Sequence, residues 1–285
     1  MRILVLRCGI DGGAAALPEG YGGADVREFG VVPSRKDLAF LADVAAEVLP
    51  HDDQPTPDEI AKGKEVPHLG EPRFAEQRPS ERVRVVVEGP DASLAAVVTH
   101  LMRRNLLWFE VAHVPTAPSP AARNWGAATG LTFAEALVRE VRPVPLIRDD
   151  TGQAIVGFAL LTEPGIDGTS SRGGLRGEVW VDSTELFSGT AHGVQVRPIP
   201  DAPGLVAAEL PPPADGARRW FRKLADDDGL ENMAGSPRPM HEPVTGRAVQ
   251  AGGPGFRYVR DGVEAKKPRE KCTIYRHLLD LQLVR

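Results

Sequence analysis

Residues 82–104 read RVRVVVEGPDASLAAVVTHLMRR, in which a β-branched run, a short turn and an amphipathic stretch follow one another directly. The run from Val83 to Val87 is typical of a strand buried on both faces of a parallel sheet. After the turn, apolar side chains recur at the i, i+3, i+4, i+7 and i+8 positions counted from Leu94, as on the buried face of a helix. Arg103 and Arg104 complement the negative end of that helix. The stretch therefore predicts a strand, a turn and a helix at the heart of an α/β domain with a parallel sheet.

The flanking sequence extends this unit on both sides. Phe109 to Val114 predicts the next strand, which completes the βαβ unit of a parallel sheet. Toward the N-terminus we expect strands at Arg2 to Leu6 and at Asp25 to Val32, then a helix capped by Ser34 that stops at Pro50. Residues 51–80 are polar and rich in proline, which predicts a long loop. With a helix expected over residues 132–141, residues 1–142 form an α/β nucleotide-binding-like domain.

Helical periodicity largely disappears after Pro143. Strands predicted at residues 144–147 and 154–161 flank the turn sequence DDTG at 149–152. Further short strands are predicted at residues 178–181, 194–197, 205–210, 257–259, 273–276 and 279–284. We infer that residues 143–285 form an antiparallel β-sandwich domain whose last strand is free to return to the first domain. The fold class is thus α/β plus mainly β, with a cleft between the two domains.

Composition limits the partners of the protein. The 285 residues carry a net charge of −5, so the fold as a whole does not attract nucleic acid or an anionic membrane, and any basic site is local. The two cysteines, Cys8 and Cys272, lack the spacing of a zinc or redox motif and are expected to be reduced thiols. The apolar run at the N-terminus is too short for a signal peptide, and no stretch approaches a membrane span. We therefore expect a soluble cytoplasmic protein.

Three places in the chain resemble the diacylglycerol kinase family, in its bacterial lipid kinase branch, which is related to NAD kinases and sphingosine kinases. VEGPDASL at 87–94 resembles that family's strand followed by Gly-Gly-Asp-Gly-Thr-Leu, with Pro90 and Ala92 in place of glycines. VPTAPSPAARNWG at 114–126 resembles the second loop, whose flanks survive while its glycines do not. YVRDGVE at 258–264 resembles the strand that ends in Asp-Gly-Glu, with one residue inserted.

The resemblance implies a nucleotide between the two domains and transfer of the ATP γ-phosphate, with Mg²⁺, to a lipid or another small hydroxyl-bearing molecule. Asp261 would correspond to the catalytic base. The cofactor-binding residues carried over are Gly89, Asp91, Ser93, Thr116 and Arg123. For partners we also allow a homodimer and at most peripheral contact with a membrane.

The replaced residues weaken the expected chemistry, because phosphates are held by backbone N–H groups. Pro90 has no N–H group, and Ala92 disfavours the positive φ that glycine permits. If the Glu88 carboxylate points inward, at about 5 Å it repels each unit of phosphate charge by roughly 3 kcal/mol; it could equally point to solvent or bind a metal. These losses predict weak binding of ATP and Mg²⁺. Two hypotheses stay open: an ATP-dependent lipid kinase, or a catalytically inactive member of the fold that binds a nucleotide, a lipid or a partner protein.

Other motifs have ordinary structural explanations. Asp261 and Gly262 form one of the commonest hairpin turn sequences, so Asp261 is as well explained by a turn as by catalysis. His51, Asp52 and Asp53 lack a second cluster of ligands, so we predict no protein metal site there. The sequence GIDGT at 165–169 imitates a phosphate loop but is followed by residues that do not begin a helix. The basic stretch 217–225 predicts a helix of two turns with buried aromatic side chains, and its alternative is a membrane-surface contact.

Overall fold

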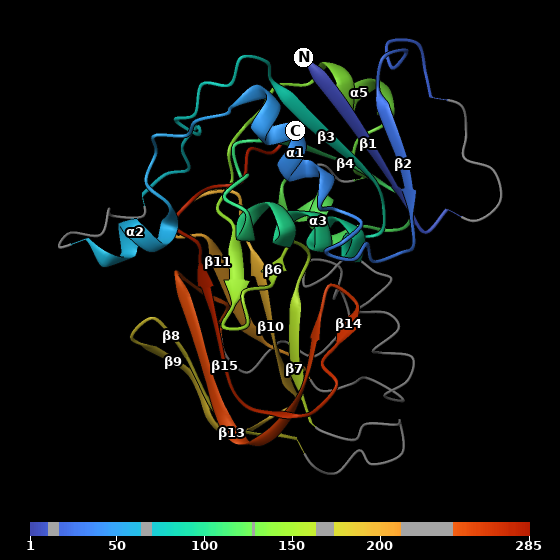
Figure 1. Cartoon of the computed structure of the whole chain (residues 1–285). Coiled ribbons are helices and arrows are strands. Elements are labelled where there is room, and N and C mark those ends of the chain that lie inside the picture. The colour runs from blue at the N-terminus through green and yellow to red at the C-terminus, as the bar shows by residue number, and fades with distance from the viewer. Residues whose placement is uncertain (11–16, 64–69, 127–128, 164–173, 212–241) are drawn as a thin grey trace.

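The computed structural model describes residues 1–10, 17–63, 70–126, 129–163, 174–211 and 242–285. A four-stranded parallel sheet with helices lies above a large antiparallel sheet (Figure 1). The parallel sheet has the order β2-β1-β3-β4, and its strands are β1 (Arg2–Cys8), β2 (Asp25–Phe29), β3 (Val83–Gly89) and β4 (Glu110–Pro115). All seven residues of β3 are buried, as its β-branched run predicted. The fold class expected from the sequence is confirmed.

The helices are short except for the one that follows β3. They are α1 (Phe40–Val48), α2 (Pro57–Lys62), α3 (Asp91–Arg103), α4 (Pro120–Asn124) and α5 (Phe133–Val138). Ser34 and Asp37 do exchange side chain to backbone hydrogen bonds, but these close a turn, and α1 begins only at Phe40. The expected loop at 51–80 was wrong in part because Thr56 and Glu59 form a capping box that starts α2.

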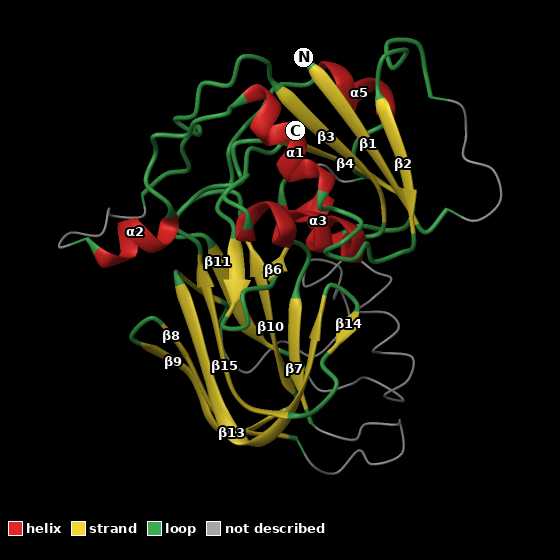
Figure 2. Ribbon diagram, viewed as in Figure 1, coloured by secondary structure: helices red, strands yellow, loops and turns green. Residues whose placement is uncertain are grey.

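The second sheet has eleven antiparallel strands in the part of the chain that the structure describes (Figure 2). They are β5 (Ile147–Asp149), β6 (Ala154–Ile155), β7 (Ala159–Thr162), β8 (Leu175–Val181), β9 (Thr184–Ala191), β10 (Gly193–Pro198), β11 (Leu205–Glu209), β12 (Val244–Gly246), β13 (Ala248–Arg260), β14 (Val263–Glu264) and β15 (Arg269–Arg276). The 13-residue β13 is central, since it pairs with β7, β8, β14 and β15. The hairpin predicted at DDTG is confirmed between β5 and β6.

Three details of this sheet depart from the sequence-based expectation. The stretch predicted as one strand at 154–161 is broken by Val156–Phe158 into β6 and β7. The strands β9, β12 and β14 were not expected, and of β13 only residues 257–259 were predicted. Residues 279–284 form no continuous strand and make single bridges instead, from Leu281 to Val144, from Leu283 to Val111 and from Val284 to Val141.

These bridges tie the C-terminal segment to the parallel sheet. Leu281 and Leu283 are buried in the same apolar cluster as Leu4 and Phe109. Val144 and Val156, which lie beyond the predicted boundary at residue 142, belong to that cluster as well. The two predicted domains therefore share one core, and the boundary itself remains a prediction.

Two predictions fall on residues that the structure does not describe, the phosphate-loop imitation at 165–169 and the basic helix at 217–225. Among the described helices, none has both the length and the apolar character needed to cross a bilayer.

Candidate functional site

The turn from β3 into α3 holds the first carboxylate of the site. Gly89 is required there, because a Cβ at this position would lie 2.7 Å from Ser93 Oγ and 3.0 Å from the Cys8 carbonyl oxygen. The Gly89 carbonyl oxygen accepts a hydrogen bond from His113 Nε2 at 2.9 Å, which fixes the turn against β4. Pro90 is the N-cap of α3 with φ −71°, so Asp91 is the first helical residue.

The Asp91 carboxylate turns toward the start of α4. Its Oδ1 accepts from Ser119 Oγ at 2.5 Å, and its Oδ2 accepts from the Ala121 N–H at 2.8 Å. Ser119 caps α4 at the same time, since its Oγ accepts from the Ala122 N–H at 2.9 Å. Asp91 thus occupies the donors at the start of α4 that a bound anion would otherwise use.

Asp261 lies in the tight turn between β13 and β14, with a positive φ of +47°. Its carboxylate accepts three backbone N–H groups, from Val156 at 3.1 Å, Gly157 at 2.8 Å and Phe158 at 3.0 Å. Burial, and next the negative charge of Asp91, raise the pKa of Asp261 to about 7, although the three N–H donors favour its ionised form. The turn reading of Asp-Gly is correct, and the same residue is the second carboxylate of the site.

Gly157 brings the two carboxylates together. A Cβ on Gly157 would lie 2.7 Å from Asp91 Oδ2 and 3.1 Å from Asp261 Oδ1, so these oxygens are less than about 6 Å apart. Asn124 of α4 holds the same backbone from the other side, because its Nδ2 donates to the carbonyl oxygens of Val156 (3.2 Å) and Gly157 (2.6 Å). The segment Val156–Phe158 is therefore held between Asn124 and Asp261, at the junction of the two sheets.

The remaining predicted site residues have mixed surroundings. Ser93 is fully buried, and its Oγ donates to the Val31 carbonyl oxygen at 2.6 Å. The Thr116 N–H donates to the Gly89 carbonyl oxygen at 3.4 Å, so this residue lies beside the turn. Arg123 is half-buried in the last turn of α4. Hence Asp91, Asp261, Gly89 and Thr116 converge at the site, whereas the Ser93 hydroxyl is used to hold the loop after β2.

Glu88 does not take any of the orientations expected for it. It is buried, and its Oε2 lies 3.1 Å from Nε of the equally buried Arg7 on the neighbouring strand β1. A second cation near the site, Arg260, pairs with Asp149 at 3.1 Å. Glu88 is therefore neutralised within the sheet, and the repulsion expected from it does not arise.

Four residues of the site were not predicted from the sequence: His113, Ser119, Asn124 and Gly157. The dipeptide Ser119-Pro120 carries a usable signal, since serine before proline is a common helix start. His113 donates through Nε2 to a carbonyl, so its buried Nδ1 is left as an acceptor with no partner in the described part of the chain. Burial lowers the pKa of His113 and keeps it neutral.

The carboxylates of the site are poorly placed to bind Mg²⁺ together with a nucleoside triphosphate. Mg²⁺ is commonly bound by one or two carboxylates together with substrate phosphates, and Asp91 and Asp261 have that number and proximity. Their oxygens, however, already accept five hydrogen bonds from Ser119, Ala121 and Val156–Phe158. Within the described residues, no group of three or more His, Cys, Asp or Glu side chains is arranged to hold a metal. His51 and Asp53 form an exposed pair, 2.9 Å apart.

Comparison with known proteins agrees with this architecture. No protein-family model matches the chain, and no curated protein matches it. Among solved structures, a diacylglycerol kinase from Bacillus anthracis str. Sterne is similar with a TM-score of 0.57 and 11% sequence identity, over 99% of this chain and 96% of the other. A second structure from the same organism, described as a "putative diacylglycerol kinase", gives a TM-score of 0.54 and 12% identity over the same shares of the two chains. The fold is therefore that of the diacylglycerol kinases.

Proposed function

We propose that this protein uses the diacylglycerol kinase fold to bind a small hydroxyl-bearing molecule, such as a lipid alcohol, without transferring phosphate to it. The observation that carries the proposal is the seating of the Asp91 carboxylate on Ser119 and Ala121. A phosphate that approached the start of α4 would have to displace this carboxylate from both donors. The loop donors on which phosphoryl transfer depends are thus committed to the fold itself.

Electrostatics favour the same conclusion. A phosphate about 5 Å from an ionised Asp91 would be repelled by roughly 3 kcal/mol per unit charge at an effective dielectric of 20. Two cations, Arg7 of β1 and Arg260 of β13, already pair with Glu88 and Asp149. Two carboxylates have about eight acceptor positions, of which five are used, so the others can accept from a ligand hydroxyl group, which donates a hydrogen bond while carrying no charge.

The test compares two ligands on the full-length protein by thermal shift. Millimolar Mg-ATP is expected to leave the unfolding temperature unchanged, whereas a short-chain diacylglycerol such as dihexanoylglycerol raises it. A ligand at 100 times its dissociation constant stabilises the folded state by about 2.7 kcal/mol, which is readily measured. Asp91→Asn should weaken the diacylglycerol effect. Absence of a shift with dihexanoylglycerol would contradict binding, and a clear shift with Mg-ATP would contradict the loss of nucleotide binding.

An active lipid kinase is the second candidate, and one observation favours it. A carboxyl group whose pKa is raised to about 7, as for Asp261, suits a general base near neutral pH. In that case the protein would transfer labelled phosphate from ATP to a diacylglycerol, and Asp261→Asn would abolish the transfer. Equal transfer by the wild type and by Asp261→Asn would reject Asp261 as the base.

A further inference from the structure

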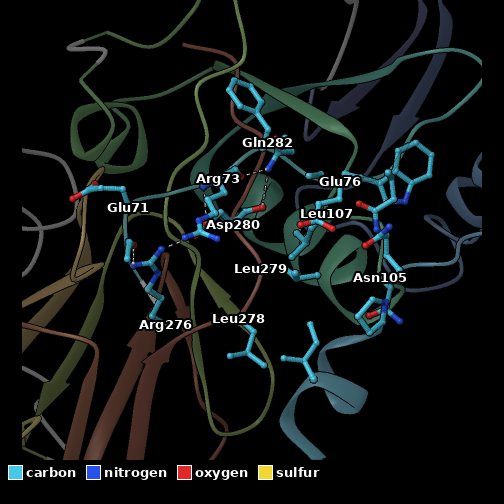
Figure 3. A pocket seen from close by; sticks show the side chains of 18 residues that line it. Glu71, Arg73, Glu76, Asn105, Leu107, Arg276, Leu278, Leu279, Asp280 and Gln282 are labelled. Atoms are coloured by element: carbon cyan, nitrogen blue, oxygen red, sulfur yellow. Dashed lines mark hydrogen bonds and ion pairs between the residues drawn. The ribbon is translucent and has the colours of Figure 1, made fainter. Parts of the chain in front are cut away.

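A cavity of about 300 Å³ lies at the other end of α3 from the two aspartates. Its wall includes residues 70–77, which we call the strap, together with the turn after α3 and the segment that follows β15. Figure 3 shows Arg276 and Glu71 toward one end of this pocket and Asn105 toward the other, with Leu278 and Leu279 between them. Since α3 has 13 residues, the cavity and the Asp91 site are separated by about 20 Å along the helix.

The strap is held in place by side chains of the C-terminal segment. Arg276 Nη1 donates to the Gly70 carbonyl oxygen at 2.7 Å, and Asp280 Oδ2 accepts from the Arg73 N–H at 2.9 Å. Gln282 Nε2 donates to the Arg73 carbonyl oxygen at 3.2 Å. The Arg276 side chain is 1% exposed and pairs with Asp280, so the cavity has a built, charged floor. These bonds fix the strap along the C-terminal segment at Gly70 and Arg73.

The interior of the cavity is mainly apolar. Ile60, Leu107 and Leu279 line it, and two aromatic side chains, Phe74 and Trp108, lie in its wall. Phe74 is 66% exposed although it is a large apolar residue. A volume of about 300 Å³ is at the small end of the range for ligand pockets, which fits one aliphatic chain.

The charges around the cavity favour a cation. Its lining residues include the carboxylates of Glu71, Glu76 and Asp280 and the guanidinium groups of Arg73 and Arg276. Arg276 and Asp280 neutralise each other at 2.9 Å. The other charged lining residues are Glu71, Glu76 and Arg73, which form no ion pair within the described part of the chain and together leave a net charge of −1. Aromatic faces such as those of Phe74 and Trp108 also attract cations.

We propose that this cavity is a second binding site, separate from the aspartate site, for an aliphatic amine: a single hydrocarbon chain that carries a positively charged head group. The chain lies between Leu107, Leu279 and Trp108, and the ammonium group is held at the strap by Phe74 and Glu76. The proposal does not depend on the function assigned to Asp91 and Asp261.

The test uses three probes with the same eight-carbon chain: octylammonium, octanoate and octan-1-ol. Binding to the full-length protein is measured by isothermal titration calorimetry below micellar concentrations. Octylammonium is expected to bind about fivefold more tightly than octanoate, a modest preference because ion pairs in contact with water are weak. Glu76→Gln should reduce this preference.

Phe74→Ala tests the location of the site. Phe74 is largely exposed, so the variant should fold normally and yet bind octylammonium about tenfold more weakly through lost apolar contact. The matched control is Val138→Ala on α5, where a side chain 75% exposed should leave binding unchanged. The proposal is overturned if octylammonium does not bind, if octanoate binds equally or more tightly, or if Phe74→Ala binds like the wild type.

Discussion

Replacing Asp91 by asparagine should change the pH dependence of stability more than stability itself. The amide is isosteric with the carboxylate, so its oxygen can accept from the Ala121 N–H and its NH₂ group can donate to Ser119 Oγ. What the variant removes is the negative charge less than about 6 Å from the Asp261 carboxylate. The pKa of Asp261 should therefore fall from its value of about 7.

The size of the effect follows from the causes of that pKa. Burial is the largest cause of the raised pKa of Asp261, and the negative charge of Asp91 is the second. Removing the charge of Asp91 should therefore lower the pKa of Asp261 by roughly one unit, which corresponds to about 1.4 kcal/mol. A carboxyl group with a raised pKa destabilises the fold as it ionises, so the wild type should lose stability as the pH rises from about 4 to 7. In Asp91→Asn the loss of stability should end about one pH unit lower than in the wild type, and the total loss should be smaller by the same step.

The assay is urea unfolding of the two proteins at several pH values from 5 to 8. Relative to wild type, Asp91→Asn should gain about 1 kcal/mol between pH 5 and pH 8. His113 is the other titratable group whose pKa responds to Asp91, so the pair is also measured in a His113→Gln background, where the gain should persist. Asp53→Asn, at an exposed position, serves as the control. A difference between the two proteins that is constant over this pH range would refute the coupling of the two aspartates.

Three further predictions concern the packing of the fold. Gly157→Ala places a Cβ 2.7 Å from Asp91 Oδ2 and should cost about 1–3 kcal/mol in urea unfolding, whereas Gly30→Ala, with open space around it, should be nearly neutral. Ser93→Ala removes the hydrogen bond to Val31 and should cost about 1 kcal/mol; a stability equal to wild type would contradict a structural role. Arg84→Met breaks a buried pair with Glu110 and two bonds to carbonyl groups, and a loss of about 3 kcal/mol is expected by chemical denaturation; a loss below 1 kcal/mol would show that Arg82 compensates.

The sequence predicted those parts of the fold that rest on local patterns. The β-branched run of β3 and the apolar period of α3 are strong signals, because each repeats over several residues and both were found where expected. The hairpin at Asp149 follows from turn chemistry in the same way, since its carboxylate accepts from the Thr151 and Gln153 N–H groups. Strand β9 was missed because its apolar residues, Leu186, Phe187 and Ala191, do not alternate with polar ones, and β12 was missed because it has only three residues.

The site itself depends on contacts between distant segments, which no local pattern reports. Asp91 and Asp261 are 170 positions apart, and only the placement of Gly157 between them makes them neighbours. Likewise, the sequence left open whether Glu88 points toward a phosphate, toward solvent or toward a metal, whereas the structure pairs it with Arg7 on the neighbouring strand. The family resemblance pointed to Asp91 and Asp261. That their carboxylates accept hydrogen bonds from Ser119, Ala121 and Val156–Phe158 follows only from the three-dimensional arrangement.

The C-terminal segment has a consequence for how the chain folds during synthesis. Val111 of β4 donates its N–H to Gln282 and accepts from Val284, and Leu283 fills the core beneath β1 and β3. When residues 1–142 have left the ribosome, every strand of the parallel sheet is therefore present, but residues 281–284, which cover its core, are not. Residues 281–284 emerge only after residues 143–280 have been synthesised, so the apolar surface that they cover stays open to chaperones during that time.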